Sequence, residues 1–301
     1  MSTLSVTGGT GFVGGTLINL ARETGHHIRA LTRRPQPAHE GVTWIAGALD
    51  RPEALAELVA GADAMIHVAG VVNAPDRAGF ATGNIDGTRA IVQAAEQAGV
   101  RRFVHVSSLA AREPQLSAYG WSKAEAEHVV EDSALDWVMV RPPAIYGPGD
   151  MEMRELFRLA KLGVALTPPA GRLSVIEVSD LGRLLLALAG AATNQRLLEA
   201  DDGRSGGWSH AEFARAIGAA VGKPVKPIAL PRALLTVAAW GDRLVRGKRA
   251  KLTPDRVAYF CHPDWTIDPA KRPDPALWQP EIATPAGLAA TASWYRAHSL
   301  L

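Results

Sequence analysis

The stretch "TGGTGFVG" at residues 7–14 decides the fold class of this chain. Its glycines Gly8, Gly11 and Gly14 follow the spacing G-x-x-G-x-x-G, between a short apolar strand and a helical pattern at residues 12–25. Glycine lets the backbone approach a ligand closely, and a helix that follows directs free N–H groups and its positive dipole end at an anion. The stretch therefore predicts a turn that holds a pyrophosphate, the alternative being a tight turn without a ligand.

The first half of the chain alternates between strand-like and helix-like segments. Strands are expected at 4–8, 27–32, 42–47, 64–70, 102–108 and 136–142, and helices at 12–25, 52–61, 84–100 and 119–132. The strands lack a clear polar–apolar alternation, which is typical of a parallel sheet covered on both faces. With right-handed crossovers this order predicts an α/β fold, a Rossmann-type doubly wound parallel sheet.

The second half has a looser pattern. Helices are expected at 152–162, 179–191, 209–221 and 231–246, and prolines are frequent from 254 to 285. We therefore expect a dinucleotide-binding domain at 1–147 and a smaller, irregular, mostly helical substrate lobe at 148–301. Within that lobe, residues 174–191 are expected to return to the main sheet through a strand at 174–178.

Composition and charge restrict the classes of protein to which the chain belongs. A net charge of +2 gives no reason to expect nucleic-acid binding, and one cysteine, Cys261, permits no internal disulfide. The start of the sequence lacks a signal pattern, and the longest apolar run, 184–192, is far shorter than the roughly 20 residues of a membrane span. We expect a cytoplasmic protein with a small-molecule substrate, without a membrane span and without a nucleic-acid partner.

The end of the second strand indicates which dinucleotide is bound. The sequence there reads "LTRRP", with Thr32, Arg33 and Arg34 where a carboxylate would bind the ribose hydroxyls of NAD. An arginine pairs with a 2′-phosphate, so the sequence predicts NADP(H) in preference to NAD(H). The alternative is a solvated pair of loop charges.

The candidate catalytic residues lie in "VSS" and "SAYGWSK". Ser108 ends the fifth strand, and Tyr119 and Lys123 are four residues apart, on one face of the next helix. A free phenol has a pKa near ~10, and a nearby ammonium, together with the positive nicotinamide ring of an oxidised cofactor, favours the phenolate. Tyr119 would then move a proton at a substrate oxygen during hydride transfer, with Ser108 bonded to that oxygen. The alternative is a surface helix preceded by a serine that caps a turn.

The whole chain resembles the extended branch of the short-chain dehydrogenase/reductases, with most likeness to 3β-hydroxysteroid dehydrogenases and dihydroflavonol reductases. The residues that carry the resemblance are "TGGTGFVG", "HVAG" (67–70), "GNIDGT" (83–88), "VSS" (106–108), "YGWSK" (119–123), "RPPAIYGPGD" (141–150) and "VIEVSDLGRLLLALA" (175–189). The resemblance implies an NAD(P)-dependent oxidoreductase with Ser108, Tyr119 and Lys123 as the catalytic set, and Asn84 matches the family's helix asparagine.

The resemblance also implies which residues contact the cofactor. They are Thr7, Gly8, Thr10, Gly11, Phe12, Val13, Gly14, Arg33, Arg34, Leu49, Asp50, Ala69, Gly70, Tyr119, Lys123, Pro142, Ala144 and Ile145. The family often has Gly-Asp-Leu after the third strand where this chain has Gly-Ala-Leu-Asp, which leaves the role of Asp50 open.

Three functions are compatible with these motifs. The first is an NADP(H)-dependent oxidoreductase that interconverts a ketone or aldehyde and an alcohol on an apolar small molecule. The others are a nucleotide-sugar epimerase or dehydratase with tightly bound NAD(P), and a non-catalytic scaffold that binds the cofactor. The short segment between Ser108 and Tyr119 disfavours a bulky nucleotide sugar. Family resemblance further implies a homodimer through the helices at 84–99 and 119–132.

Some features have no assigned role. The histidines lack a metal-binding spacing, so no metal is expected. The basic run 243–251 could face an acidic substrate, an anionic lipid surface or a partner, although a solvated face is the simpler interpretation. Trp208, Trp240 and Trp265 are expected to pack within the second lobe. Met151, Met153 and Phe157 line either an apolar substrate pocket or the core.

Overall fold

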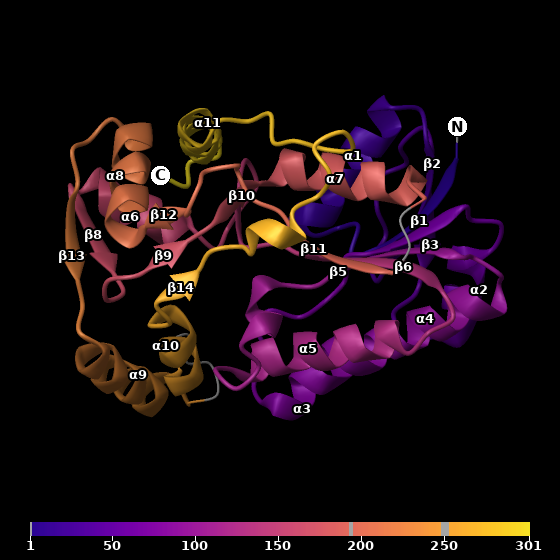
Figure 1. Cartoon of the computed structure of the whole chain (residues 1–301), viewed down its shortest axis with the longest axis horizontal. Helices are drawn as coiled ribbons and strands as arrows, with labels where there is room; N and C mark the ends of the chain where they lie inside the picture. The colour runs from indigo at the N-terminus through magenta and orange to yellow at the C-terminus, as the bar shows by residue number, and fades with distance from the viewer. Residues whose placement is uncertain (1, 193–194, 248–252) are drawn as a thin grey trace.

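The main sheet confirms the predicted Rossmann-type architecture. The computed structural model describes residues 2–192, 195–247 and 253–301 (Figure 1). Seven parallel strands pair in the order β11-β6-β5-β4-β1-β2-β3. Their bounds are β1 Thr3–Thr7, β2 His27–Thr32, β3 Val42–Ala46, β4 Ala64–His67, β5 Arg102–Val106, β6 Asp136–Arg141 and β11 Arg196–Glu199. The sequence predicted six of these and missed β11, a four-residue strand "RLLE" in the second half of the chain.

Helices cover both faces of this sheet (Figure 1). Helices α1 (Phe12–Glu23) and α7 (Val178–Gly190) pack together on one face. Helices α2 (Pro52–Val59), α4 (Gly87–Gln97) and α5 (Ala118–Glu131) cover the other.

The two faces have separate hydrophobic cores because successive side chains of a strand point to opposite sides. On β5, Val104 joins the core under α1 and α7, whereas its neighbour Phe103 joins the core under α2, α4 and α5. Both side chains are fully buried. Two buried faces explain why the strands show no polar alternation in sequence.

The strand expected at 174–178 does not join the main sheet. Residues Val175–Glu177 form β10, which pairs in parallel with β7 (Ala144–Tyr146) in a separate two-stranded sheet. The chain returns to the main sheet after β10, because α7 packs on α1 and the strand after α7, β11, pairs with β6. Helix α7 thus connects β10 in the small sheet to β11 at the edge of the main sheet.

The rest of the second half contains more strand than expected. Small sheets of the described residues join β8 (Val164–Thr167) to β13 (Lys226–Ala229), and β9 (Arg172–Leu173) to β12 (Trp208–Ser209) and β14 (Asp264–Trp265). The helices there are α6 (Arg154–Lys161), α8 (His210–Val221), α9 (Arg232–Arg246), α10 (Pro254–Phe260) and α11 (Thr284–Ala297). Short helical turns are α3 (Arg77–Phe80), η1 (Ala81–Asp86), η2 (Leu109–Arg112) and η4 (Pro269–Lys271).

A third core holds this second half together. Phe157 and Tyr295 are fully buried, and their rings meet edge-on with centroids 5.1 Å apart. Trp208 and Trp265 are buried as expected, but Trp240 is 63% exposed, so the expectation that it packs inside is wrong. Helix α8 begins with a capping box, in which the Ser209 hydroxyl accepts a hydrogen bond from the Glu212 N–H.

No helix within the described ranges is both long enough and apolar enough to span a bilayer.

Candidate active site

A cleft lies along the carboxyl ends of the parallel strands, the edge where open α/β sheets bind ligands. Its volume is about 1900 Å³, whereas pockets for one drug-sized ligand rarely exceed roughly 1,000 Å³. The cleft is therefore large enough for a dinucleotide and a substrate together. One wall comes from the main sheet and the other from α10 and the residues before it.

Most of the residues expected at the site line this cleft. They are Gly8, Thr10, Gly11, Phe12, Val13, Gly14, Arg33, Leu49, Asp50, Ala69, Gly70, Ser108, Tyr119, Lys123, Pro142, Ala144 and Ile145. Thr7 does not line the cleft, because its side chain is buried with Oγ1 2.7 Å from Nδ1 of His67. Arg34 lines a smaller adjoining pocket of about 480 Å³, which Arg33 shares.

The glycine loop is packed so tightly that it excludes side chains. Gly8 has φ +74°, and a Cβ on Gly14 would lie 2.1 Å from the carbonyl oxygen of Gly8. Helix α1 starts after Gly11 with no side-chain cap and no acidic residue in its first turn. Its first N–H groups thus lack intrahelical partners beside the cleft, and the dipole end is positive. This cradle fits a pyrophosphate group.

The two arginines after β2 are available to an anion. Arg33 and Arg34 are exposed, and no carboxylate within the described residues lies within ion-pair distance of either guanidinium. Thr32 fixes the turn, because its Oγ1 donates to the Arg34 carbonyl at 2.6 Å. Asp50 is also exposed, and its Oδ1 lies 4.0 Å from Nε of Arg51.

The three candidate catalytic residues come together in the cleft. Helix α5 begins after Ser117, whose side chain accepts a hydrogen bond from the Gly120 N–H at 3.0 Å. This cap places Tyr119 in the first turn and Lys123 one turn later on the same face. Ser108 accepts a hydrogen bond from the Ala110 N–H at 3.2 Å, and its side chain is also hydrogen-bonded to that of Tyr119.

The acidity of Tyr119 differs from the expectation. Burial raises the pKa of the phenol, and the hydrogen bond with Ser108 lowers it only in part. The net shift is upward, so Lys123 by itself does not make the phenol acidic in this structure, and the contribution expected from the oxidised nicotinamide ring stays a prediction. The physical reason is that desolvation disfavours the phenolate more strongly than the neighbouring groups favour it.

Lys123 is held as a buried cation. It is 4% exposed, and its Nζ donates to the Val106 carbonyl at 2.8 Å. Burial lowers the pKa of Lys123 to about 8, while the carboxylate of Glu127 raises it in part. At neutral pH the lysine is still mostly protonated and can donate hydrogen bonds into the cleft.

Asn84 supports the floor of the cleft from the π-helical turn η1. Its Oδ1 accepts from the Val71 N–H at 2.7 Å, and its Nδ2 donates to Ser122 Oγ at 2.8 Å. A Cβ on Gly70 would lie 3.0 Å from this Oδ1 and 3.8 Å from Lys123 Nζ, so the lysine head faces Gly70. Single π-helical turns are frequent at functional sites.

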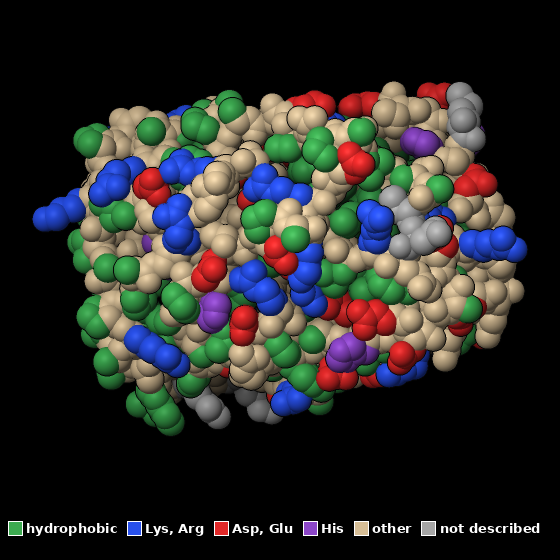
Figure 2. All heavy atoms as spheres, viewed as in Figure 1, with side chains coloured by type: hydrophobic (Ala, Val, Ile, Leu, Met, Phe, Trp, Pro, Cys, Tyr) green, Lys and Arg blue, Asp and Glu red, His purple; other side chains and the backbone are tan. Residues whose placement is uncertain are grey.

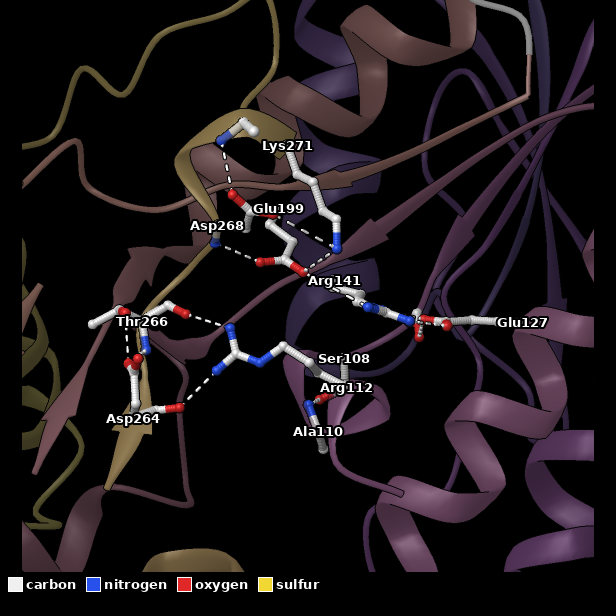
Figure 3. Close-up of polar contacts among 12 residues, drawn as sticks. Ser108, Ala110, Arg112, Glu127, Arg141, Glu199, Asp264, Thr266, Asp268 and Lys271 are labelled. Atoms are coloured by element: carbon white, nitrogen blue, oxygen red, sulfur yellow. Dashed lines mark hydrogen bonds and ion pairs between the residues drawn. The ribbon is translucent and has the colours of Figure 1, made fainter. Parts of the chain in front are cut away.

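A buried ionic network lies behind the catalytic residues (Figure 3). Glu127, one turn after Lys123, accepts a hydrogen bond from Ser107 and a bidentate pair from Arg141, with Nε–Oε1 at 2.8 Å. Arg141 continues to Glu199, whose Oε1 is 3.7 Å from the guanidinium and 3.7 Å from Lys271 Nζ. The network therefore links α5, β6, β11 and η4.

A second link joins the catalytic loop to the distant segment 264–266 (Figure 3). Arg112, at the end of η2, donates to the backbone carbonyls of Thr266 at 2.7 Å and Asp264 at 2.6 Å. Since η2 follows directly after Ser108, this pair of hydrogen bonds holds the loop that carries Ser108 against β14.

Several apolar side chains line the cleft. They include Val72, Phe80, Met151, Met153, Tyr259 and Phe260. The Phe80 ring centroid is 6.1 Å from that of Tyr119, and burial together with the neighbouring Tyr119 raises the pKa of Tyr259. The sequence did not decide whether Met151, Met153 and Phe157 line a pocket or belong to the core. Met151 and Met153 line the cleft, and Phe157 is buried in the core.

Sequence reasoning missed the contribution of α10. Tyr259 and Phe260 follow Tyr119 by about 140 positions and carry no motif, so no local signal could have located them. Within the described part of the chain, no group of His, Cys, Asp and Glu side chains is arranged to hold a metal ion. His67 and His105 are buried and stacked, with ring centroids 5.3 Å apart.

Comparisons with known proteins agree with this geometry. Residues 8–158 match the family model described as NAD(P)H-binding. The chain is 36% identical to the ceramide reductase of Caulobacter vibrioides over 306 residues, covering 98% of this chain and 94% of that protein. It is 39% identical over 116 residues to a 3-beta-hydroxysteroid dehydrogenase of Mycolicibacterium neoaurum, covering 34% of this chain and 31% of that one. The fold matches Bordetella bronchiseptica WbmH in complex with NAD⁺, with a TM-score of 0.76, 20% identity and 98% of each chain covered.

Proposed function

This chain belongs to the NAD(P)H-binding, extended short-chain dehydrogenase/reductase family, and on that premise we propose that it reduces a carbonyl group of an apolar small molecule with NADPH. Family membership makes it an NAD(P)-dependent oxidoreductase. The substrate class, the direction and the preference for NADP(H) are the proposal.

The meeting of Ser108, Tyr119 and Lys123 in one cleft carries the proposal. The raised pKa of Tyr119 keeps its proton on the phenol at neutral pH. A carbonyl that receives a hydride must also receive a proton on its oxygen, and a neutral phenol can donate one. The protonation state therefore favours reduction.

The three catalytic residues have different roles in the proposed reaction. The nicotinamide supplies the hydride. Tyr119 donates its proton to the substrate oxygen, and Ser108 donates a hydrogen bond to the same oxygen. With a pKa of about 8, Lys123 is mostly charged at neutral pH. In this state it would hold the ribose hydroxyls of the cofactor in place. Its protonated head would also stabilise negative charge on Tyr119 after the transfer.

The apolar side chains that line the cleft support a hydrophobic substrate. Val72, Met151 and Phe260 are among the large hydrophobic side chains that remain exposed, and all three line the cleft. They lose contact with water when an apolar chain covers them, which favours binding by about 25 cal/mol per Å². A keto-bearing lipid of the ceramide class is the first substrate to test, because the relative that matches nearly the full length is named a ceramide reductase.

The proposed preference for NADP(H) rests on Arg33 and Arg34. Arg33 lies where the cleft meets the smaller pocket that Arg34 also lines, and both are exposed without a carboxylate partner within the described ranges. Replacing both with Ala should weaken NADPH binding about tenfold or more and leave NADH binding nearly unchanged. Titration of the intrinsic cofactor fluorescence measures both affinities. Equal losses for the two cofactors would contradict the preference.

The activity is tested with a matched pair of tyrosine variants. Purified protein should oxidise NADPH, followed at 340 nm, when mixed with long-chain ketones that include a keto-ceramide. Tyr119→Phe should lower kcat by about 10²-fold or more. Tyr295→Phe removes a buried hydroxyl that has no hydrogen-bond partner in the described structure, and should leave kcat unchanged.

Two results would overturn the proposal. One is equal activity of the two variants. The other is turnover of a nucleotide sugar with tightly retained cofactor and no net oxidation of NADPH, which would establish the epimerase alternative.

We also propose a homodimer that packs through α4 and α5 and acts in the cytoplasm. Light scattering after size exclusion tests the dimer, and cell fractionation tests the location.

A further inference from the structure

Helix α9 turns its large apolar side chains away from the protein. The exposed fractions are 53% for Leu234, 67% for Val237, 63% for Trp240, 89% for Leu244 and 83% for Val245. Figure 2 shows hydrophobic side chains gathered over α9 at the lower left of the view. Exposed hydrophobic side chains are ordinary when scattered singly, but a contiguous group marks a surface that meets another apolar phase.

The arrangement along the helix is the reverse of that in an ordinary surface helix. At about 100° per residue, Leu234, Val237, Leu244 and Val245 fall within an arc of roughly 100°. Ala239 lies on the opposite side and is fully buried against the protein. An ordinary surface helix buries the apolar arc and exposes the polar one, so packing against the residues that the structure describes does not account for the outward face of α9.

Positive charge is concentrated in the sequence of this helix and of the residues that follow it. By sequence, residues 231–256 contain seven of the 32 Lys and Arg residues but only two of the 30 Asp and Glu residues. The segment therefore carries a net charge of +5 and the remainder of the chain −3. Part of the basic run 243–251 lies outside the described residues, and the apolar surface consists of α9 alone. A basic segment beside an apolar face is typical of helices that lie in the interface of an anionic bilayer.

The apolar face also lies beside the opening of the cleft. Helix α9 leads directly into Gly247 and packs against α10, and both Gly247 and the α10 residue Phe260 line the cleft (Figure 1). Phe260 is 45% exposed, and Met151 on the same cleft is 48% exposed. Exposed apolar side chains thus occur both on α9 and among the residues that line the cleft.

We propose that α9 docks the protein on the surface of an anionic lipid bilayer, with its apolar face inserted at the level of the headgroups. A second copy of the chain is disfavoured as the occupant, because a symmetric contact through α9 would bring two segments of net charge +5 together. Docking does not depend on the proposed reaction, since it needs neither cofactor nor substrate.

Vesicle flotation with the full-length protein tests the docking. We expect the wild-type chain to float with vesicles of 70% phosphatidylcholine and 30% phosphatidylglycerol, and to bind pure phosphatidylcholine vesicles at least tenfold more weakly. Raising NaCl to about 0.5 M should reduce binding to the anionic vesicles. The double variant Leu244→Gln/Val245→Gln should bind them about tenfold or more weakly than the wild type.

A matched control separates docking from general hydrophobicity. Leu162, next to α6, is 77% exposed and lies outside the proposed surface, so Leu162→Gln should bind like the wild type. Trp240 should give a blue shift of tryptophan fluorescence on vesicle addition, and Trp240→Phe should abolish most of it. NADPH binding by all variants shows that the fold is intact.

Three outcomes would overturn the proposal. The first is that the wild type binds vesicles no more strongly than the Leu244/Val245 variant. The second is equal binding to neutral and anionic vesicles. The third is that the wild type does not bind vesicles and the Leu244/Val245 change converts a dimer to a monomer. The last outcome would identify a second copy of the chain as the occupant. Loss of NADPH oxidation with intact vesicle binding would overturn only the proposed function.

Discussion

Replacement of Glu127 by Gln tests the ionic network behind the catalytic helix. The carboxylate is 4% exposed, accepts a hydrogen bond from Ser107 and forms the bidentate pair with Arg141, whose side chain is 14% exposed. Gln has nearly the same shape, so the change removes the negative charge with little change in packing volume. The guanidinium of Arg141 is then left buried without its principal counter-ion.

The expected loss of stability follows from that buried charge. Breaking a buried ion pair by removing one partner costs about 3–5 kcal/mol, because the remaining charge has lost its hydration without compensation. Arg141 keeps Glu199 at 3.7 Å, and this partial compensation places the loss near the lower end, at about 3 kcal/mol. For a chain of 301 residues, with an unfolding entropy of about 2.1 cal/mol/K per residue, that loss corresponds to a fall in Tm of roughly 5 °C.

Thermal and urea unfolding, followed by circular dichroism, measure the loss. Glu125→Gln on the same helix is the control. Glu125 is 44% exposed, and its contact with the His128 ring nitrogen is long, at 4.0 Å. The double variant Glu127→Gln/Arg141→Met should recover part of the loss, because both charges of the Glu127–Arg141 pair are then gone and the buried Glu199 keeps Lys271 at 3.7 Å. A Glu127→Gln variant as stable as Glu125→Gln, or a double variant whose loss equals the sum of the single losses, would refute the reasoning.

Three further predictions concern the cofactor loop, the buried histidines and the support of the cleft. Gly14→Ala should weaken NADPH binding about tenfold or more in fluorescence titrations, because its Cβ would lie 2.1 Å from a backbone oxygen; Gly15→Ala, whose Cβ would be 3.7 Å from the nearest atom, should not. Burial lowers the pKa of His67 to about 3 and that of His105 well below 6.5, so below pH 6.5 the unfolded chain binds more protons and stability falls as pH drops toward 3. In urea titrations between pH 6.5 and 4, His105→Phe should make the fall of unfolding free energy with pH shallower. An unchanged dependence on pH would contradict the lowered pKa of His105. Asn84→Ala, which loses three hydrogen bonds, should lower the free energy of unfolding by about 2 kcal/mol; a change below about 0.5 kcal/mol would show that the bonds are dispensable.

Local pattern was sufficient for the parts of the site that lie close together in sequence. The glycine spacing requires a tight strand–helix turn wherever it stands, and Gly8 does adopt a positive φ. The four-residue spacing of Tyr119 and Lys123 places both on one face of any helix that contains them. Parallel strands end at a common edge, so Ser108 at the end of β5 could be expected beside them.

Properties that depend on surroundings were not available from the sequence. The direction of the Tyr119 pKa shift is set by the balance between burial and nearby charge, and only the packed protein shows that burial prevails. Likewise, α10 brings Tyr259 and Phe260 to the cleft across about 140 positions of sequence, and a four-residue strand such as β11 is recognised only by its pairing with β6.

Helix α9 shows most clearly where sequence and tertiary structure divide. The sequence by itself determined that a dinucleotide-binding sheet forms, that Ser108, Tyr119 and Lys123 share its ligand edge, and that residues 231–246 form a helix. Only the tertiary structure decided which way the apolar side chains of that helix face, because the sequence relates neighbours along one helix, whereas burial requires a partner from elsewhere in the chain. For Leu244 and Val245 the described chain provides no such partner.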